Sequence, residues 1–228
     1  MVMKNRYERN VSALSEKEVL ELHTKRVCVV GCGGLGGYIV EILARIGVLN
    51  ITIVDYDVFD VNNLNRQLFS AENLLGVSKV DAAASRIASI NSDVIIRTVK
   101  EKLDDTNAAN IIADHDIVVD ALDNIQTRST LSKACDNKNI PMVHGSIGGW
   151  FGQVACIFPG DGLIKKIYKD TGERGIEKKL GNLPFTASTV ASIQCAECIK
   201  LLLGRQTMKN SLMQIDLLHG ELNVIDLF

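Results

Sequence analysis

Apolar and polar positions along this chain follow two periods, one typical of strands and one typical of helices. Residues 27–30 form a short, largely β-branched apolar run, as expected of a strand that is buried on both faces. Leu35–Ile46 then carries apolar side chains at helical spacing and stops at Gly47. A second apolar run, Ile51–Val54, predicts the next strand, so this part of the chain indicates a strand–helix–strand unit.

The alternation of strands and helices continues as far as residue 144. The further predicted strands are Val94–Val99, Ile117–Asp120 and Pro141–His144, and the further predicted helices are Glu16–Leu22, Val77–Ile90, Thr106–Ala113 and Asn124–Lys138. Strands that alternate with helices form a parallel sheet, so the predicted fold class is α/β, Rossmann-like and doubly wound. Ligands of such a sheet bind beyond the carboxyl ends of its strands.

The pattern changes at Trp150. Trp150–Phe158 predicts a long strand, Thr186–Leu203 a strongly apolar helix, and Leu212–Leu218 and Leu222–Leu227 a closing antiparallel pair. We expect these strands to extend the mainly parallel sheet with antiparallel C-terminal strands. Residues 159–183 are rich in glycine and charge, and their length predicts a mobile, functional crossover loop.

The composition is that of a globular protein, and the chain shows no internal repeat, linker or domain boundary, so we expect one domain, residues 1–228. In the segment before the first strand, residues 6–9 are charged and have no apolar face, so periodicity alone favours a fraying terminus. No apolar run reaches the roughly 18 residues of a membrane span. The polar start Met1–Asn10 is unlike a secretory signal, and the six cysteines lie mostly within strand and helix patterns, so we expect a cytoplasmic protein. The formal net charge of -2 argues against bulk nucleic-acid binding.

A glycine motif follows the first strand. Gly31, Gly33 and Gly36 have the G-x-G-x-x-G spacing, in which the first glycine allows a tight turn, the second lets a phosphate approach the backbone, and the third lets the helix pack against the strand. Asp55 ends the second strand, 19 residues past Gly36, where a carboxylate can hold a ribose hydroxyl. The order of these parts favours a nucleotide site over a ligand-free turn, without identifying the nucleotide.

Three charged residues fall near the predicted carboxyl edge of the sheet. Lys79 lies in the first turn of its helix, where a cation opposes the helix dipole, and this weakly indicates a nearby anion. Asp123 is either a helix cap or a ligand. With Arg66 they supply cations and a carboxylate. A site that binds a triphosphate and releases pyrophosphate requires such groups, whereas a nicotinamide site does not.

A set of motifs runs in order from residue 6 to residue 204. They are R-Y-x-R (6–9), G-x-G-G-L-G (31–36), V-D-Y-D (54–57), N-L-N-R-Q (63–67), G-V-S-K (76–79), D-N-x-x-x-R (123–128), G-S-x-x-G-x-x-G-Q-V (145–154) and Q-x-x-E-x-I-K-L-L (194–202). Together they resemble the MoeB/ThiF/HesA family of ubiquitin-activating-enzyme-like adenylyltransferases. The resemblance implies one ThiF-type adenylating domain. It also implies that the C-terminal glycine of a small ubiquitin-like sulfur carrier attacks the α-phosphorus of ATP, which yields an acyl-adenylate and pyrophosphate.

The resemblance also implies roles for single residues. Asp55 would hold the ribose, Asp123 a Mg²⁺ ion, Arg66 and Lys79 the phosphates, and Asn63 would help to orient them. Arg9 would reach the β- and γ-phosphates bound by the other subunit of a homodimer. The resemblance therefore implies that residues 1–25 form a functional N-terminal helical arm and not a fraying terminus. The nucleotide-binding residues carried over by motif are Gly31, Gly33, Gly34, Gly36, Asp55, Asp57, Arg66, Lys79 and Asp123.

The chain departs from the family pattern in its cysteines. Relatives with structural zinc carry two C-x-x-C pairs, whereas here only Cys195 and Cys198 have that spacing, inside an apolar helix, so we expect no zinc. Some relatives place a cysteine in the crossover loop, but residues 159–184 contain none. Cys156 is the nearest, at a position that favours a buried strand. We therefore expect the acyl-adenylate to pass to a separate sulfur donor.

Other hypotheses remain open at this point. A related branch of the family uses ATP to cyclise a modified tRNA adenosine, although the short C-terminus and the net charge favour a protein partner. A nicotinamide oxidoreductase is supported only by the glycine motif and Asp55, and an inactive scaffold is a minor alternative. The sequence identifies neither the carrier, which the family implies ends in Gly-Gly, nor its pathway.

Overall fold

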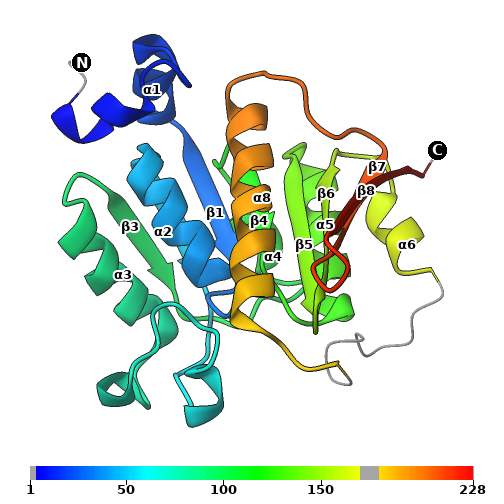
Figure 1. Ribbon diagram of the computed structural model, residues 1–228, viewed down its shortest axis with the longest axis horizontal. Helices are drawn as coiled ribbons and strands as arrows, with labels where there is room; N and C mark the ends of the chain where they lie inside the picture. The colour runs from blue at the N-terminus through cyan, green and yellow to red at the C-terminus, as the bar shows by residue number, and fades with distance from the viewer. Residues whose placement is uncertain (1–3, 170–179, 228) are drawn as a thin grey trace.

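The computed structural model describes residues 4–169 and 180–227. Its strands form one eight-stranded sheet in the order β3-β2-β1-β4-β5-β6-β7-β8 (Figure 1). They are β1 (Arg26–Val30), β2 (Asn50–Val54), β3 (Ile95–Val99), β4 (Ile117–Asp120), β5 (Met142–Gly148), β6 (Phe151–Ile157), β7 (Ser211–Asp216) and β8 (Glu221–Asp226). The first five strands in the sheet order pair in parallel and the last three continue it antiparallel, which confirms the predicted fold class.

Helices cover both faces of this sheet. The α-helices are α1 (Glu16–Leu22), α2 (Gly36–Ile46), α3 (Lys79–Ile90), α4 (Ala108–Ile111), α5 (Ile125–Lys138), α6 (Leu163–Ile167) and α8 (Pro184–Leu202), and the 3₁₀ turns are η1 (Asn5–Asn10), η2 (Val61–Asn63) and η3 (Glu72–Leu74). In Figure 1, α2, α3 and α8 lie in front of the sheet, and α4 and α5 lie behind it. Each layer covers its own apolar core.

Strand β1 shows why the sheet is buried on both sides. Successive side chains of a strand point to opposite faces. Val27 and Val29 accordingly pack in the core under α2 and α8, whereas Cys28 and Val30 pack in the core under α4 and α5. This double burial accounts for the continuous apolar run in the sequence.

The fifth strand is longer than predicted. It was expected to end at His144, but β5 continues to Gly148 through Gly145 and Ser146, residues with low strand propensity. The antiparallel partner β6 supplies the hydrogen-bonding ladder, with Gly145 opposite Val154 and Gly148 opposite Phe151. Pairing between strands therefore overrides local propensity here.

The predicted crossover loop 159–183 contains the short helix α6. Leu163 and Ile164 are buried and hold this helix against the sheet, while Asp161 Oδ1 accepts a hydrogen bond from the Leu163 N–H (2.9 Å). Residues 170–179 of the predicted loop lie outside the described residues.

The N-terminal arm is anchored to the body of its own chain. The ring of Tyr7 in η1 is 1% exposed, and its hydroxyl accepts a hydrogen bond from Asn91 Nδ2 (2.8 Å). The guanidinium of Arg6 donates to the Oδ1 atom of the same asparagine, and Lys4 pairs with Asp93. None of the described helices combines the length and apolar character that a membrane crossing needs.

The β1–α2 turn depends on two glycines that no side chain can replace. Gly31 has a φ of +99°, and a Cβ atom at Gly36 would lie 1.9 Å from the carbonyl oxygen of Gly31. A Cβ atom at Gly33, in contrast, would meet only the Gln67 side chain, at 3.6 Å or more. The fold therefore requires Gly31 and Gly36 but leaves room for a small side chain at Gly33.

We expect Gly36→Ala to lower the free energy of unfolding by about 3 kcal/mol or more, because the new methyl group forces the turn apart. Gly33→Ala should change it by less than about 1 kcal/mol. Urea unfolding of both variants measures the difference, and equal losses would contradict this account of the turn.

A second prediction concerns Glu18 in α1, which completes the predicted capping box with Ser15 and pairs with Arg205 (2.7 Å). Hydrogen bonds from the Ser15 backbone and from Arg205 lower the Glu18 pKa to about 2, from an ordinary value of 4.5. An acid with a lowered folded-state pKa stabilises the fold above its unfolded pKa, and this stabilisation is lost as the pH falls toward the folded value. The melting temperatures of wild type and Glu18→Gln should therefore differ most above about pH 4.5, approach each other as the pH falls below that value, and converge near pH 2. Glu16→Gln on the same helix is the control, and a gap that does not vary with pH would contradict the prediction.

Candidate active site

A cleft of about 350 Å³ opens at the carboxyl ends of the parallel strands. The glycine turn, the ends of β2 and β4, and the polar segment after β2 form its walls. In Figure 1 the carboxyl ends of the parallel strands lie at the bottom of the molecule, beside the segment after β2, which is drawn in cyan. Eight of the residues predicted to bind nucleotide line the cleft: Gly31, Gly33, Gly34, Asp55, Asp57, Arg66, Lys79 and Asp123.

Asp55 is held by the backbone at the end of β2. One carboxylate oxygen accepts a hydrogen bond from the Cys32 N–H (2.6 Å) and the other accepts one from the Asp57 N–H (2.8 Å). Burial raises the pKa of Asp55, and these two hydrogen bonds oppose that shift. The carboxylate is thus fixed beside the glycine turn, with lone pairs left to accept hydrogen bonds from a ligand.

Lys79 brings a buried positive charge into the cleft. Its side chain lies at the start of α3, is 6% exposed as a residue, and places Nζ 3.0 Å from Asp57 Oδ2. A buried ammonium group requires an anion beside it. Asp57 is half exposed and supplies that anion in this structure, and a phosphate oxygen has the charge to replace it.

Arg66 is the second cation of the cleft. Its Nη1 atom donates to the Asn62 carbonyl oxygen and to Asn65 Oδ1, each at 2.8 Å, and both acceptors are neutral. Within residues 4–169 and 180–227 it forms no ion pair with a carboxylate. Its charge is therefore available to an anionic ligand.

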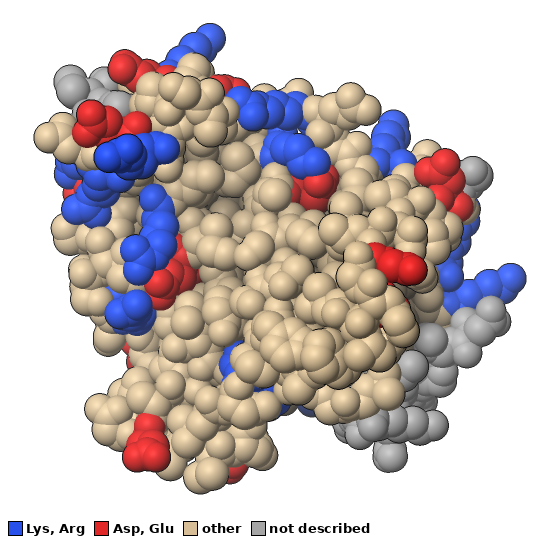
Figure 2. Space-filling model, viewed as in Figure 1, with Lys and Arg blue, Asp and Glu red and all other residues tan. Residues whose placement is uncertain are grey.

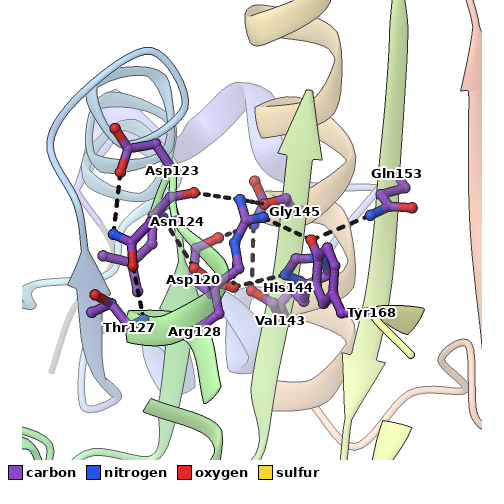
Figure 3. A network of polar contacts seen from close by, with 12 residues as sticks. Asp120, Asp123, Asn124, Thr127, Arg128, Val143, His144, Gly145, Gln153 and Tyr168 are labelled. Carbon is purple, nitrogen blue, oxygen red and sulfur yellow. Dashed lines mark hydrogen bonds and ion pairs between the residues drawn. The ribbon is translucent and has the colours of Figure 1, made fainter. Parts of the chain in front are cut away.

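Asp123 presents an exposed carboxylate at the turn between β4 and α5. The N-cap of α5 is Asn124, whose Oδ1 accepts a hydrogen bond from the Thr127 N–H (2.8 Å), so capping does not use the carboxylate of Asp123. Of the two roles left open from the sequence, the helix cap belongs to the neighbouring residue. Figure 3 shows Asp123 above Asn124, which reaches it through Nδ2 (3.4 Å).

Three of the predicted residues do not line the cleft. Gly36 packs against the Gly31 carbonyl. Asn63 is buried, with Oδ1 accepting from the Asp60 N–H (3.1 Å) and Nδ2 donating to Asn62 (2.6 Å), so it shapes the turn that carries Arg66. Arg9 is exposed in η1, at the opposite edge of the sheet from the cleft (Figure 1).

The structure also adds residues to which no role had been given. Gln67 and Asn182 line the cleft, and each has a buried side-chain oxygen without a hydrogen-bond partner among the described residues. Gln67 follows Arg66 in a motif noted in the sequence, which could have indicated it. Asn182 reaches the cleft from the far end of the crossover segment, and no local pattern marks it.

A buried polar network lies behind the β4–β5 wall of the cleft (Figure 3). Asp120 Oδ2 lies 2.7 Å from His144 Nδ1, and His144 Nε2 lies 3.1 Å from the Tyr168 hydroxyl. Arg128 Nη1 donates to the same hydroxyl (2.7 Å), and Arg128 also lines the cleft. Arg128 ends the D-N-x-x-x-R motif, but the sequence alone gives this arginine no role.

The acidic residues fit a Mg²⁺ ion that is shared with a phosphate ligand. The described residues contain no group of three or more His, Cys, Asp or Glu side chains that could hold a metal ion by themselves. Mg²⁺ is commonly held by one or two carboxylates together with phosphate oxygens and water. The exposed carboxylate of Asp123 beside the two cations suits this arrangement.

Three cysteines that could have bound zinc or attacked a substrate are all buried: Cys156, Cys195 and Cys198. Burial raises the pKa of the Cys156, Cys195 and Cys198 thiols and so disfavours the thiolate form that binds metals or attacks substrates. Cys156 lies on β6 and Cys195 and Cys198 lie on α8, as expected.

Comparison with known proteins identifies the family of this chain and several relatives. The ThiF family matches residues 7–227 of the chain. The chain is 36% identical over 185 residues to the SAMP-activating enzyme E1 of Haloferax volcanii, covering 80% of this chain and 68% of that protein. It is 32% identical over 188 residues to the molybdopterin-synthase adenylyltransferase of Escherichia coli, covering 80% and 75%.

Solved structures share the fold at lower sequence identity. Escherichia coli MccB in a crystal structure with ATP has a TM-score of 0.83 at 21% identity, covering 99% of this chain and 72% of that one. The Escherichia coli tRNA N6-threonylcarbamoyladenosine dehydratase, TcdA, has a TM-score of 0.76 at 23% identity, covering 90% and 98%. With a family match over nearly its whole length and relatives above 30% identity, this chain belongs to the ThiF family.

Proposed function

We propose that this chain is an adenylyltransferase that uses ATP to activate the C-terminal glycine carboxylate of a small ubiquitin-like sulfur-carrier protein ending in Gly-Gly. The convergence of Arg66, Lys79 and Asp123 on one cleft beside the glycine turn carries the proposal. Two relatives of this chain are named as an activating enzyme E1 and as an adenylyltransferase, which supports the same reaction. The whole chain then acts as one adenylating domain.

The reaction joins two anions. A carboxylate oxygen of the carrier attacks the α-phosphorus of ATP, a new P–O bond forms, and the bond to the β-phosphate breaks, so pyrophosphate leaves with the electron pair. Repulsion between the carboxylate and the triphosphate opposes this approach, and fixed cations reduce it. Arg66 and Lys79 supply those cations in the proposed site.

The glycines and the charged residues of the cleft have distinct parts in the proposed reaction. Gly33 and Gly34 allow the phosphates to approach the backbone, and Asp55 accepts hydrogen bonds from the ribose. Lys79 exchanges Asp57 for a phosphate oxygen. Asp123 holds Mg²⁺, which when bound neutralises charge on the phosphates.

Arg9 acts in this proposal from a second copy of the chain. The hydrogen bond between Tyr7 and Asn91 holds the segment of Arg9 at the amino ends of the parallel strands, opposite the cleft. Arg9 therefore cannot turn into the cleft of its own chain. Figure 2 shows an area without Lys, Arg, Asp or Glu in the middle of the face that bears α8, with charged side chains at the left and upper margins of that face. An uncharged area of this kind favours contact between copies over contact with a nucleic acid. We infer a homodimer in which Arg9 completes the neighbouring site.

Because Cys156 is fully buried, we propose that no cysteine of this chain captures the activated carboxylate and that a separate sulfur donor receives it. We further propose that the protein contains no zinc and acts in the cytoplasm, where its buried thiols stay reduced.

We expect Asp123→Ala to lower carrier-dependent ATP–pyrophosphate exchange by about 100-fold or more, since the Mg²⁺ ligand is lost. Its melting temperature should stay close to that of wild type because the side chain is exposed. Asp105→Ala removes another exposed carboxylate and serves as the control. Full activity of Asp123→Ala would remove the proposed Mg²⁺ role, and exchange by wild type that requires tRNA instead of a carrier would replace the proposed substrate.

Mixing two inactive variants tests the role of Arg9. Arg9→Ala and Asp123→Ala should each be inactive alone, whereas an equimolar mixture that exchanges subunits should recover about a quarter of wild-type activity, since half of the dimers contain one complete site. No recovery after verified subunit exchange would show that Arg9 does not act across the dimer.

A further inference from the structure

Tyr168 directly follows α6 and reaches the network behind the cleft. Its hydroxyl oxygen accepts hydrogen bonds from Arg128 Nη1 (2.7 Å) and from Gln153 Nε2 (3.3 Å). These partners belong to α5 and β6 and lie 40 and 15 residues from Tyr168 along the chain. The hydroxyl of Tyr168 thus connects the end of α6, within the crossover segment 159–183, to Arg128 in the wall of the cleft (Figure 3).

The protonation of the neighbouring histidine determines the direction of these hydrogen bonds. His144 is fully buried, and burial lowers its pKa although Asp120 opposes this shift, which favours the neutral ring. Its Nδ1–H donates to Asp120 Oδ2 (2.7 Å), which leaves Nε2 to accept the Tyr168 O–H (3.1 Å). The lone pairs of the tyrosine oxygen are then directed to Arg128 and Gln153.

Arg128 uses its guanidinium to hold backbone. Nη2 donates to the Leu122 carbonyl oxygen and to the Gly145 carbonyl oxygen (3.2 Å), and Nε lies 3.5 Å from Asp120 Oδ2. Leu122 immediately precedes Asp123. The position of the guanidinium therefore determines the position of the turn that carries the exposed carboxylate.

We propose that Tyr168 is a positioning residue for the Mg²⁺ and triphosphate site, acting through Arg128 on the turn that carries Asp123. The role of Asp123 in this inference rests on the proposed function. Tyr168 does not line the cleft and touches no reacting atom. Its hydroxyl fixes one Nη atom of Arg128 while the other Nη atom binds the turn, so the loss of the hydroxyl releases the guanidinium on one side.

Tyr168→Phe removes the hydroxyl and retains the ring. The ring still packs edge-on against His144 (centroids 5.6 Å apart) and under the Arg128 guanidinium (5.6 Å). The matched control is Thr52→Val, because Thr52 Oγ1 also contacts a histidine, His115 (2.8 Å), from a buried position outside the cleft. Both variants lose one hydroxyl–imidazole contact, so both should lose stability.

The decisive measurement is the Mg²⁺ dependence of ATP binding by the full chain, and calorimetry measures this binding. For Tyr168→Phe we expect the half-saturating Mg²⁺ concentration to rise about tenfold, as is typical when a group that supports a metal ligand is removed. ATP affinity without Mg²⁺ should change less than about threefold. Thr52→Val should alter neither quantity. An equal Mg²⁺ response in the two variants would mean that Tyr168 is only structural and would overturn the inference.

Two further variants complete the test. Arg128→Lys cannot bind the turn and the hydroxyl together, so adding Tyr168→Phe to it should have no further effect, whereas additive effects would overturn the inference. If Tyr168→Phe does not fold, Gln153→Leu removes the second donor to the hydroxyl and should raise the half-saturating Mg²⁺ concentration by about twofold to threefold. No rise would count against the inference.

The same assays separate this inference from the proposed function. Wild type that binds ATP with Mg²⁺ but shows no carrier-dependent exchange would overturn the substrate assignment and leave the comparison of Tyr168→Phe with Thr52→Val intact. Wild type whose ATP binding does not respond to Mg²⁺ would overturn both.

Discussion

The close contact between two turns determines where the glycines of the cleft lie relative to Asp123. A Cβ atom at Gly31 would lie 2.5 Å from the carbonyl oxygen of Ala121, so the β1–α2 turn touches the β4–α5 turn through bare backbone. One turn carries the glycines that a phosphate can approach, and the other carries Asp123. Because the two turns share this contact, the carboxylate and the glycines stay within the reach of one ligand.

The sequence predicted those parts of the site that follow from local patterns. The apolar run of β1, the glycine spacing and the acidic end of β2 lie within one strand–helix–strand unit, so their arrangement depends little on the remaining chain. Arg66, Lys79 and Asp123 were placed at the same sheet edge because the carboxyl ends of parallel strands meet there. Lys79 and Asp57 were both assigned to the nucleotide, but their ion pair with each other was not foreseen, because it joins residues on either side of an irregular segment.

Features that depend on distant partners escaped prediction. The extension of β5 through Gly145–Gly148 requires β6, and the order of the N-terminal arm requires Asn91, which is 84 residues from Tyr7. Asn182 reaches the cleft and Tyr168 reaches the network behind it, both from the crossover segment 159–183, and neither belongs to a periodic or spaced pattern. Propensity and periodicity describe neighbours along the chain, whereas these contacts arise only after the sheet has formed.

The ion pair between Lys79 and Asp57 has a consequence for ligand affinity. A lysine without a partner in this position would leave a bare buried charge in the empty protein and would gain strongly from any phosphate. Here Lys79 releases the Asp57 carboxylate when it binds a phosphate oxygen, so one ion pair replaces another. The net gain in binding free energy from this lysine is therefore small. Exchange of Asp57 for a phosphate oxygen therefore limits how much Lys79 adds to the affinity for a nucleotide, which suits an enzyme that releases pyrophosphate in every cycle.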